Sequence, residues 1–302
     1  MSDMTGKTCL VTGATSGIGF ETALCLARSG ARVIGVGRDS SRCADAAARI
    51  ADAAPGADVR YEVADLSSLA EVRRLAARLR DREPRLDVLV NNAGLFTFRR
   101  AESVDGIEMQ LAVNYLAPFL LTNELLPLLA ATPRARVVFL SSGSHFQGRI
   151  RWSDPGRHSF YNGLAAYEQS KLAVLMLART LAHRLGPESS IDTYAADPGL
   201  VRTDIGKKDR SRIVGWVWGL RTRGGMTAAE SAAAVAWLAS EPSIAGVTGR
   251  YWKERAQITP SARAVDPDAC RRVWDLSERL CVPARGHAAG LSVRSARGIV
   301  PG

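Results

Sequence analysis

The sequence predicts an α/β domain in which helices cover both faces of a mainly parallel sheet. Two observations lead to this prediction. Short β-branched runs alternate with longer helical patterns, as is typical of parallel strand–helix–strand units. The runs Val33–Val36, Val88–Val90 and Val137–Leu140 are apolar throughout, as expected for strands that are buried on both faces.

The first half of the chain contains four predicted strands separated by helices. Gly30 ends the first helix, Pro55 and Gly56 end the second, and Ser67 is a suitable N-cap for the third. The predicted strands are Thr8–Thr12, Arg32–Val36, Val59–Val63 and Asp87–Val90. The predicted helices are Ile18–Ser29, Ser40–Ala53 and Ser68–Arg82.

The second half continues the alternation after a long helical stretch, Gly106–Leu129, in which Pro118 and Pro127 predict a kink or a step. The remaining predicted elements are the strands Arg136–Leu140, Ile191–Ala196 and Gly249–Trp252 and the helices Leu164–Leu185 and Thr227–Ser240. No linker rich in proline, serine or charge precedes residue 284. We therefore expect one domain over residues 1–284 and a basic, flexible tail over 285–302.

The composition is that of a folded globular protein. Apolar residues make up 46% of the 302 residues and charged residues 23%, which excludes a disordered, collagen-like or rod-like chain. No apolar run approaches the roughly 18 residues needed to cross a bilayer, and the N-terminus has no apolar signal core. The five cysteines have no metal-like spacing and suit reduced thiols. We expect a cytoplasmic protein with no membrane span and no metal.

The net charge of +10 is concentrated in two segments. Residues 202–223 carry seven Lys or Arg and two Asp, and residues 285–302 carry three Arg and no acid. The rest of the chain is nearly balanced. Because nucleic-acid binding requires a basic face across the fold, this distribution predicts no nucleic-acid partner.

The motif TGATSGIG (12–19) follows the first predicted strand and opens the first helix. Its glycines permit a sharp turn and a close approach to a pyrophosphate, whose charge the helix N-terminus stabilises. A tight turn without a ligand is the alternative. The candidate cofactor residues in this motif are Gly13, Thr15, Ser16, Gly17, Ile18 and Gly19.

Charged residues follow the second and third predicted strands. In a dinucleotide-binding fold the second strand ends at the adenosine ribose, where an acid binds the 2′-hydroxyl and an Arg favours a 2′-phosphate. Because Arg38 precedes Asp39, NADP(H) is favoured over NAD(H); the alternative is a solvated Arg–Asp turn. Asp65 could accept a hydrogen bond from the adenine amino group, or simply end its strand.

Asparagines mark two further positions. The motif NNAG (91–94) ends the fourth strand, where amides can hold neighbouring backbone and small residues can leave room for a cofactor ring. By itself this motif is more often a structural turn. Asn114 lies in an apolar helical stretch, and a buried amide requires hydrogen-bond partners. The Asn114 side chain could therefore bind a water or a backbone carbonyl at a functional site. An ordinary core amide whose hydrogen bonds are all made is an equal alternative.

The sharpest local feature is YEQSK (167–171), because it places Tyr167 and Lys171 on one helix face. A phenol with a pKa near 10 is a poor base, and a nearby ammonium lowers that pKa. Tyr167 could then exchange a proton with an alcohol or a carbonyl. A solvated helical pair is the alternative.

Ser142 lies at the end of a predicted strand, at the edge of the sheet where ligands bind. Its hydroxyl could hold a substrate oxygen, or Ser142 is only a residue that ends the strand.

Taken together, these motifs closely resemble the short-chain dehydrogenase/reductase family over residues 5–282. Within it the chain is most similar to the branch of retinol dehydrogenases and WW-domain oxidoreductase-like enzymes. The matching elements are TGATSGIG (12–19), Asp65, NNAG (91–94), Asn114, Ser142, YEQSK (167–171) and PGLVRT (198–203). The stretches that indicate the branch are residues 19–39, 113–129, 198–206 and 246–252. Asp197 departs from it, since the branch usually has a neutral residue or His there.

The resemblance implies a single Rossmann-fold domain with a seven-stranded parallel sheet. It implies that Tyr167 is the catalytic acid/base and that Lys171 lowers its pKa and binds the nicotinamide ribose. Ser142 would hold the reacting oxygen, and Asn114 would support a water-linked proton relay to Lys171. Thr203 would hold the nicotinamide carboxamide. The further cofactor contacts that the resemblance implies are Leu66, Asn91, Ala93, Gly94, Pro198, Gly199 and Val201.

Substrate loops of the family follow Thr203, which places this region at about residues 204–225. Trp216 and Trp218 lie there in an apolar run flanked by basic residues, which predicts a lid over a bulky apolar substrate. A helix packed on the core or a subunit contact is the alternative. Ser144 and His145 are further candidate substrate residues.

The expected activity is NADP(H)-dependent interconversion of a carbonyl and an alcohol on a small-molecule apolar substrate, with the cofactor supplying the hydride chemistry. A biosynthetic tailoring enzyme on the same fold is one alternative, performing epimerisation, reductive cyclisation or double-bond reduction. A non-catalytic dinucleotide-binding sensor or interaction protein is another. The resemblance also implies a homo-oligomer. Some family members carry an N-terminal membrane anchor, which we do not expect in this protein.

Overall fold

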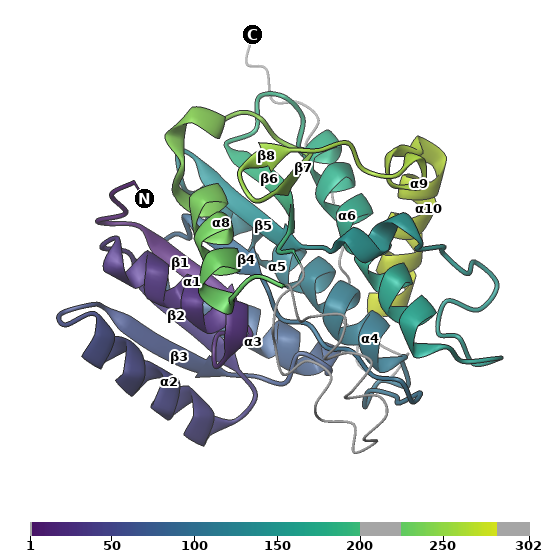
Figure 1. The fold of residues 1–302 in the computed structure, drawn as a ribbon, viewed down its shortest axis with the longest axis horizontal. Coiled ribbons are helices and arrows are strands. Elements are labelled where there is room, and N and C mark those ends of the chain that lie inside the picture. Colours follow the sequence, from purple (N-terminus) through teal and green to yellow (C-terminus); the bar gives the residue numbers. More distant parts are fainter. Residues whose placement is uncertain (1, 200–224, 283–302) are drawn as a thin grey trace, which may run out of the picture.

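The computed structural model describes residues 2–199 and 225–282, and in this part of the chain all strands join one sheet (Figure 1). The strand order is β3-β2-β1-β4-β5-β6-β7-β8, and neighbouring strands are parallel except for β7 and β8. The strands are β1 (Thr8–Thr12), β2 (Arg32–Gly37), β3 (Val59–Val63), β4 (Val88–Asn91), β5 (Ala135–Leu140), β6 (Ile191–Asp197), β7 (Arg250–Lys253) and β8 (Ala256–Gln257).

The prediction of a doubly wound parallel sheet is confirmed, but the strand number is corrected from seven to eight. The added strand, β8, pairs antiparallel with β7 through a short turn in which Glu254 has a φ of 57°. β8 has only two residues, and both are exposed. A strand this short has no apolar alternation, so the sequence pattern contains no signal for it.

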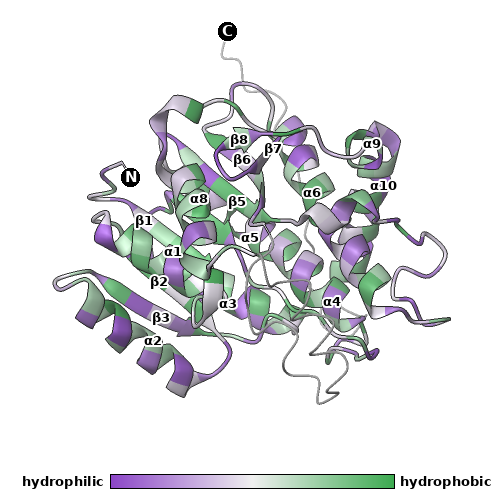
Figure 2. Cartoon of the chain, in the orientation of Figure 1, coloured by the Kyte–Doolittle hydropathy of each residue, from purple (hydrophilic) through white to green (hydrophobic). Residues whose placement is uncertain are grey.

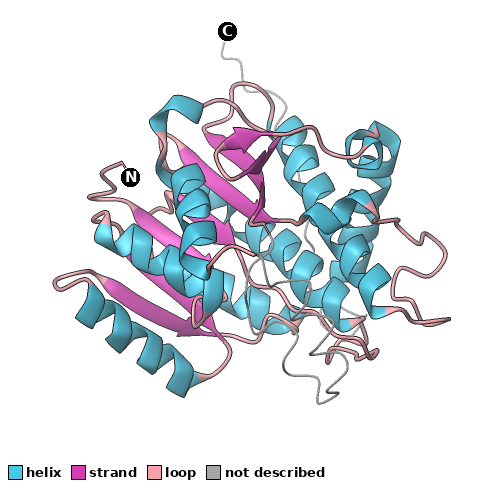
Figure 3. Ribbon diagram, viewed as in Figure 1, coloured by secondary structure: helices cyan, strands magenta, loops and turns pink. Residues whose placement is uncertain are grey.

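Helices cover both faces of the sheet (Figure 3). One face packs against α1, α2 and α8, and the other against α3, α5 and α6, with α10 beside α6. The helices of the first face are α1 (Gly17–Arg28), α2 (Ser40–Ala53) and α8 (Ala228–Ser240). Those of the second are α3 (Leu69–Arg82), α5 (Ala117–Ala130), α6 (Gly163–Leu185) and α10 (Pro267–Cys281). The short helices are α4 (Met109–Leu111), α9 (Ala262–Val265), η2 (Gly143–Phe146) and η3 (Pro242–Ile244).

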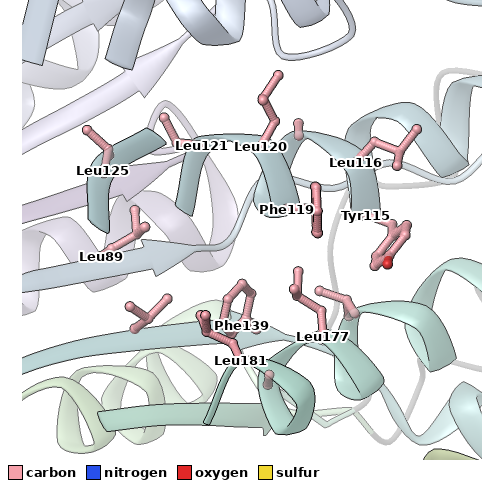
Figure 4. Close-up of a cluster of buried hydrophobic side chains, with 14 of the residues drawn as sticks. Leu89, Tyr115, Leu116, Phe119, Leu120, Leu121, Leu125, Phe139, Leu177 and Leu181 are labelled. Carbon is pink, nitrogen blue, oxygen red and sulfur yellow. The ribbon is translucent and has the colours of Figure 1, made fainter. Parts of the chain in front are cut away.

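The core has two halves, one on each face of the sheet. Between the sheet, α5 and α6, Leu89 and Phe139 of the strands meet Phe119, Leu125 and Leu181 of the helices (Figure 4). The outer face of α2 is hydrophilic, whereas the central strands are hydrophobic (Figure 2). Burial of these apolar side chains from both faces is the main force that stabilises the strand order.

The long helical stretch is stepped, as the sequence predicts. It is divided into α4, a π-helical turn η1 (Ala112–Leu116) and α5. Pro118 lies in the first turn of α5, directly after the π-turn. The wider π-turn carries Asn114, and such turns are frequent at functional sites.

The helix α10 is not among the elements predicted from the sequence. Its N-terminus has a clear signal, because Asp266 accepts hydrogen bonds from the N–H groups of Asp268 and Ala269 and Pro267 occupies the first turn. Its buried face is formed by Val273, Trp274, Ser277 and Cys281. These four positions recur at helical spacing, so the sequence does carry a signal for α10, and the prediction missed it.

Within the described ranges, no helix is long and apolar enough to span a membrane. Residues 204–224 of the predicted substrate lid and the predicted tail, 285–302, lie outside these ranges.

Glu83, which follows α3, is expected to stabilise the outer strands. This buried carboxylate accepts two hydrogen bonds from Arg32, at 2.7 and 3.1 Å, and one from Arg60 at 2.7 Å. Glu83→Ala would leave both guanidinium groups without this partner, and we expect it to lower the free energy of unfolding by about 2–4 kcal/mol in urea titrations. The matched control is Asp45→Ala, which removes an exposed partner of Arg49 and should cost under about 0.5 kcal/mol. Equal losses for the two variants would contradict this prediction.

Candidate active site

The predicted site residues gather at the carboxyl edge of the sheet. The strand order reverses between β1 and β4, and ligands of doubly wound sheets bind at this point. The turn after β1 carries the glycine motif, the turn after β4 carries NNAG, and the ends of β5 and β6 carry Ser142 and Asp197. The residues lie far apart in the sequence, and the parallel topology brings them to one edge.

The glycine-rich turn is closely packed and leaves the start of α1 open. Gly13 and Gly17 have φ values of 67° and 56°, which favour glycine. A Cβ at Gly19 would lie 2.3 Å from the carbonyl oxygen of Gly13. Ser16 caps α1 without using its side chain, and no acid occupies the first turn. The free N–H groups and the helix dipole therefore suit a pyrophosphate.

Asn92 and Thr12 hold this turn against the end of β4. The Asn92 amide donates to Thr12 O at 2.7 Å, and the Thr12 hydroxyl accepts from the backbone N–H groups of Asn92 and Ala93, each at 3.0 Å. The Asn91 amide instead donates to Thr122 of α5, at 3.0 Å. The sequence prediction that an amide of this motif holds neighbouring backbone is thus fulfilled by Asn92, which was not itself among the predicted site residues.

The residues after β2 and β3 differ in what their side chains contact. Asp39 accepts a hydrogen bond from the N–H of Arg42 and caps α2, so its carboxylate is engaged in the helix. Arg38 is exposed beside it. Asp65 is also exposed, and one of its oxygens accepts from the N–H of Ser67 at 2.9 Å. Leu66 packs against the core.

Asn114 and Lys171 meet at Gly94. The Asn114 amide exchanges hydrogen bonds with Leu95, accepting from its N–H at 2.8 Å and donating to its carbonyl at 2.9 Å, and it also donates to Ser170. A Cβ at Gly94 would lie 3.5 Å from Asn114 Oδ1 and 3.6 Å from Lys171 Nζ. The small space above Gly94 is therefore bordered by an amide oxygen and by an amine, as a water-linked relay would require.

The amine of Lys171 is buried at the end of β5. Its Nζ donates to the carbonyl oxygen of Leu140 at 2.9 Å, and 5% of the residue is exposed. Burial lowers the pKa of this amine to about 8, against a smaller opposing effect of the Asp197 carboxylate. Lys171 is thus a cation that changes its charge close to neutral pH.

Tyr167 lies one turn before Lys171, whose Nζ is 5.5 Å from the centre of its ring. Burial raises the pKa of Tyr167 to about 12, and the Asp197 carboxylate raises it further, whereas hydrogen bonding with Ser142 lowers it. The expected lowering of the phenol's pKa by Lys171 is therefore not what this structure shows, because burial has the largest effect. A phenol in this state is a proton donor at neutral pH.

Ser142 caps the short helix η2, and its hydroxyl accepts a hydrogen bond from the N–H of Ser144 at 3.2 Å. His145 is fully buried. Its Nδ1 donates to Ser142 O at 2.9 Å and its Nε2 accepts from the N–H of Ser261 at 3.2 Å, so both ring nitrogens are engaged. The imidazole therefore holds the turn that presents Ser142.

Phe96, which was not among the predicted site residues, lies beside Tyr167, and Phe98 packs on Phe96. The ring of Phe96 meets the Tyr167 ring edge-on, with centroids 5.6 Å apart, and meets Phe98 at 4.5 Å. Both residues closely follow the NNAG motif in the sequence, and this proximity is the sequence feature that could have marked them as site residues. They form an apolar border on one side of the phenol.

Pro198 and Gly199 follow β6, and the hydroxyl of Ser231 donates to the carbonyl of Pro198 at 2.6 Å. The predicted cofactor residues Val201 and Thr203 and the predicted substrate residues Trp216 and Trp218 lie outside the described residues.

A turn suited to a pyrophosphate, next to a proton-donating phenol and a buried amine, is the arrangement of a dinucleotide-dependent enzyme. The family model described as short chain dehydrogenase matches residues 7–213. The chain belongs to the short-chain dehydrogenase/reductase family, whose members are oxidoreductases that bind a nicotinamide dinucleotide.

Known relatives match most of the chain. It is 37% identical over 296 residues to human retinol dehydrogenase 14, covering 91% of this chain and 86% of that protein. It is 37% identical over 301 residues to mouse polyprenol dehydrogenase, covering 95% and 87%. Among solved structures, the Pseudomonas aeruginosa RhlG/NADP active-site complex has a TM-score of 0.67 and 31% identity, covering 83% of this chain and 95% of that one.

Gly94→Ala tests the space between Asn114 and Lys171. Its φ is not in the left-handed region and the added methyl group would meet its neighbours at ordinary contact distances, so we expect unchanged thermal unfolding. The methyl would occupy the space in which a water could join the two side chains, and turnover should fall by about tenfold or more. Unchanged turnover in a folded, cofactor-binding variant would show that this space is not used.

Proposed function

We propose that the protein is an NADP(H)-dependent oxidoreductase that interconverts a carbonyl and an alcohol on a bulky apolar substrate. The observation that carries this proposal is that Asn114, Ser142, Tyr167 and Lys171 lie at the same edge of the sheet as the glycine-rich turn. These four residues are the catalytic residues of the proposal.

In this proposal Tyr167 exchanges the proton of the reacting oxygen. Because the pKa of the phenol is about 12, it holds its proton at neutral pH and can donate it when a carbonyl is reduced. The Ser142 hydroxyl, whose interaction with the phenol lowers the phenol's pKa, orients the same oxygen. In the alcohol-oxidising direction the same two hydroxyls act in reverse, and the phenolate requires the nearby ammonium of Lys171.

The nicotinamide dinucleotide, when bound, supplies the hydride chemistry. The chain's own residues fit it, since the start of α1 has no side-chain cap and no acid in its first turn, and Lys171 has a protonated amine close to neutral pH. Lys171 would bind ribose hydroxyls, and Asn114 would hold, above Gly94, a water that relays a proton to or from Lys171. The cofactor contacts of Asp65, Leu66, Asn91, Ala93, Pro198, Gly199, Val201 and Thr203 remain predictions.

An apolar substrate is favoured by the aromatic border that Phe96 and Phe98 form beside Tyr167. It is also favoured by the names of relatives that refer to retinol and polyprenol. The Trp216 and Trp218 lid stays a prediction. We reassign His145 from substrate contact to support of the Ser142 turn, because both of its ring nitrogens are already hydrogen bonded.

Tyr167→Phe is the test of the mechanism. After a panel of ketones, aldehydes and secondary alcohols has identified a substrate by NADPH absorbance, this variant should lose about 10²–10⁴-fold in kcat while retaining cofactor binding. The matched control is Tyr161→Phe, which removes a hydroxyl bonded to Glu108 at 2.9 Å and should leave kcat close to the wild-type value. Undiminished turnover by Tyr167→Phe would exclude the proposed acid/base. Cofactor binding without turnover of any compound in the panel would favour the non-catalytic sensor.

Arg38→Ala tests the cofactor preference. Because Asp39 is engaged as the cap of α2 and Arg38 is exposed beside it, the 2′-phosphate of NADPH has a guanidinium to pair with. The Kd for NADPH should rise about tenfold or more, and that for NADH should change little, as measured by fluorescence titration. The control for the loss of one positive charge is Arg49→Ala in α2. The guanidinium of Arg49 lies over the ring of Phe20. Equal losses for both cofactors would contradict the role of Arg38.

A further inference from the structure

Asp197 is a buried carboxylate at the centre of the active-site edge that the proposed mechanism does not use. It is the last residue of β6, and 8% of it is exposed. Its Oδ1 accepts a hydrogen bond from the N–H of Gly199 at 3.0 Å. A Cβ built on Gly143 would lie 3.3 Å from its Oδ2. This side chain is therefore hydrogen bonded to the turn that follows β6 and lies close to the turn that presents Ser142.

The sheet register places this carboxylate near the Lys171 amine. Lys171 donates to the carbonyl of Leu140, and Leu140 is paired with Ala196, the residue before Asp197. The Lys171 backbone carbonyl also accepts from the Ser141 hydroxyl at 2.8 Å, which fixes α6 against the end of β5. β6 and β7 lie beside α6 at this point (Figure 1).

A buried ammonium is costly unless an opposite charge lies near it. Among the described residues, Asp197 is the group whose negative charge acts on Lys171. The other titratable groups that face this carboxylate are Tyr167 on α6, His145 on η2 and Tyr251 on β7. All three are neutral near pH 7, since burial raises the pKa of each phenol and lowers that of the imidazole.

We propose that Asp197 is a positioning residue that serves as the counter-charge of the Lys171 ammonium and joins the turns on which Ser142 and Gly199 lie. This inference rests on the proposed function, in which a protonated Lys171 assists Tyr167. It also explains why a charged residue is compatible with this position, where the resembling branch usually has a neutral residue or His. Without the carboxylate, Lys171 would lose its proton at a lower pH. The enzyme would then be active over a narrower range of pH.

Asp197→Asn isolates the charge, because the amide is nearly isosteric and its oxygen still accepts from the N–H of Gly199. The chain has only five lysines, namely Lys7, Lys171, Lys207, Lys208 and Lys253. Selective ¹⁵N-lysine labelling therefore gives an NMR spectrum with few side-chain amine signals, in which each amine can be followed. The signal that disappears in Lys171→Met assigns the buried amine. In the intact wild-type protein we expect it to titrate near pH 8. In Asp197→Asn the midpoint should fall by about one pH unit.

The matched control is Asp192→Asn on the same strand. Asp192 is 5% exposed and its carboxylate accepts from the backbone N–H of Gly246 at 2.9 Å, so it resembles Asp197 in burial and bonding. It lies near the opposite end of β6, and its loss should leave the Lys171 midpoint unchanged. Asp197→Glu, which retains the charge, should keep the midpoint close to that of the wild type. If Asp197→Asn does not fold, Asp197→Ser, which keeps a hydroxyl acceptor, replaces it.

The titration does not require turnover, so its result is independent of whether the proposed reaction is correct. A Lys171 midpoint that is unchanged in Asp197→Asn, or that falls equally in Asp192→Asn, would overturn the counter-charge assignment. For the active enzyme, the alkaline loss of kcat should move to lower pH by the same amount in Asp197→Asn. A drop in kcat without that displacement would show a purely structural role and would also overturn the proposal.

Discussion

The burial of the Lys171 amine is the constraint on which the arrangement of the active site depends. A drop of the pKa from 10.5 to about 8 corresponds to about 3 kcal/mol of destabilisation of the ammonium relative to the free amine. This net cost already includes the opposing field of the Asp197 carboxylate, and the amine donates a hydrogen bond to the Leu140 carbonyl. Both groups are at strand ends, so the parallel pairing of β5 and β6 determines where the cation can lie.

The same constraint links proton chemistry to architecture. Asn114 lies in a π-turn, and its amide is held by both backbone groups of Leu95, so its oxygen is fixed on the side of Gly94 that faces Lys171. Each group is placed by hydrogen bonds to backbone at the carboxyl edge. Such preorganisation is what catalysis by positioning requires, because groups that are already oriented need no reorganisation during proton transfer.

The sequence predicts the parallel sheet and its helices well, because β-branched apolar runs and glycine stops are local signals. It also predicts the edge at which Ser142, Tyr167 and Lys171 meet, since that follows from strand polarity. The two-residue β8 was missed because it is too short to show a pattern, whereas α10 was missed although its cap and its helical spacing are present in the sequence. The direction of the Tyr167 pKa shift was also wrong, because the balance between burial and a charge depends on packing that no local pattern reports.

Asp197 shows why a departure from a family pattern requires the structure for its interpretation. In sequence it is only an acid before Pro198, compatible with a solvated turn. In the fold it is buried, it accepts the N–H of Gly199 and it approaches Gly143, so its charge acts on groups from α6, η2 and β7 together. A buried carboxylate near a buried amine and near neutral phenols favours the protonated state of each. The carboxylate therefore favours the proton-loaded form of the site, which is the form that the reduction of a carbonyl consumes.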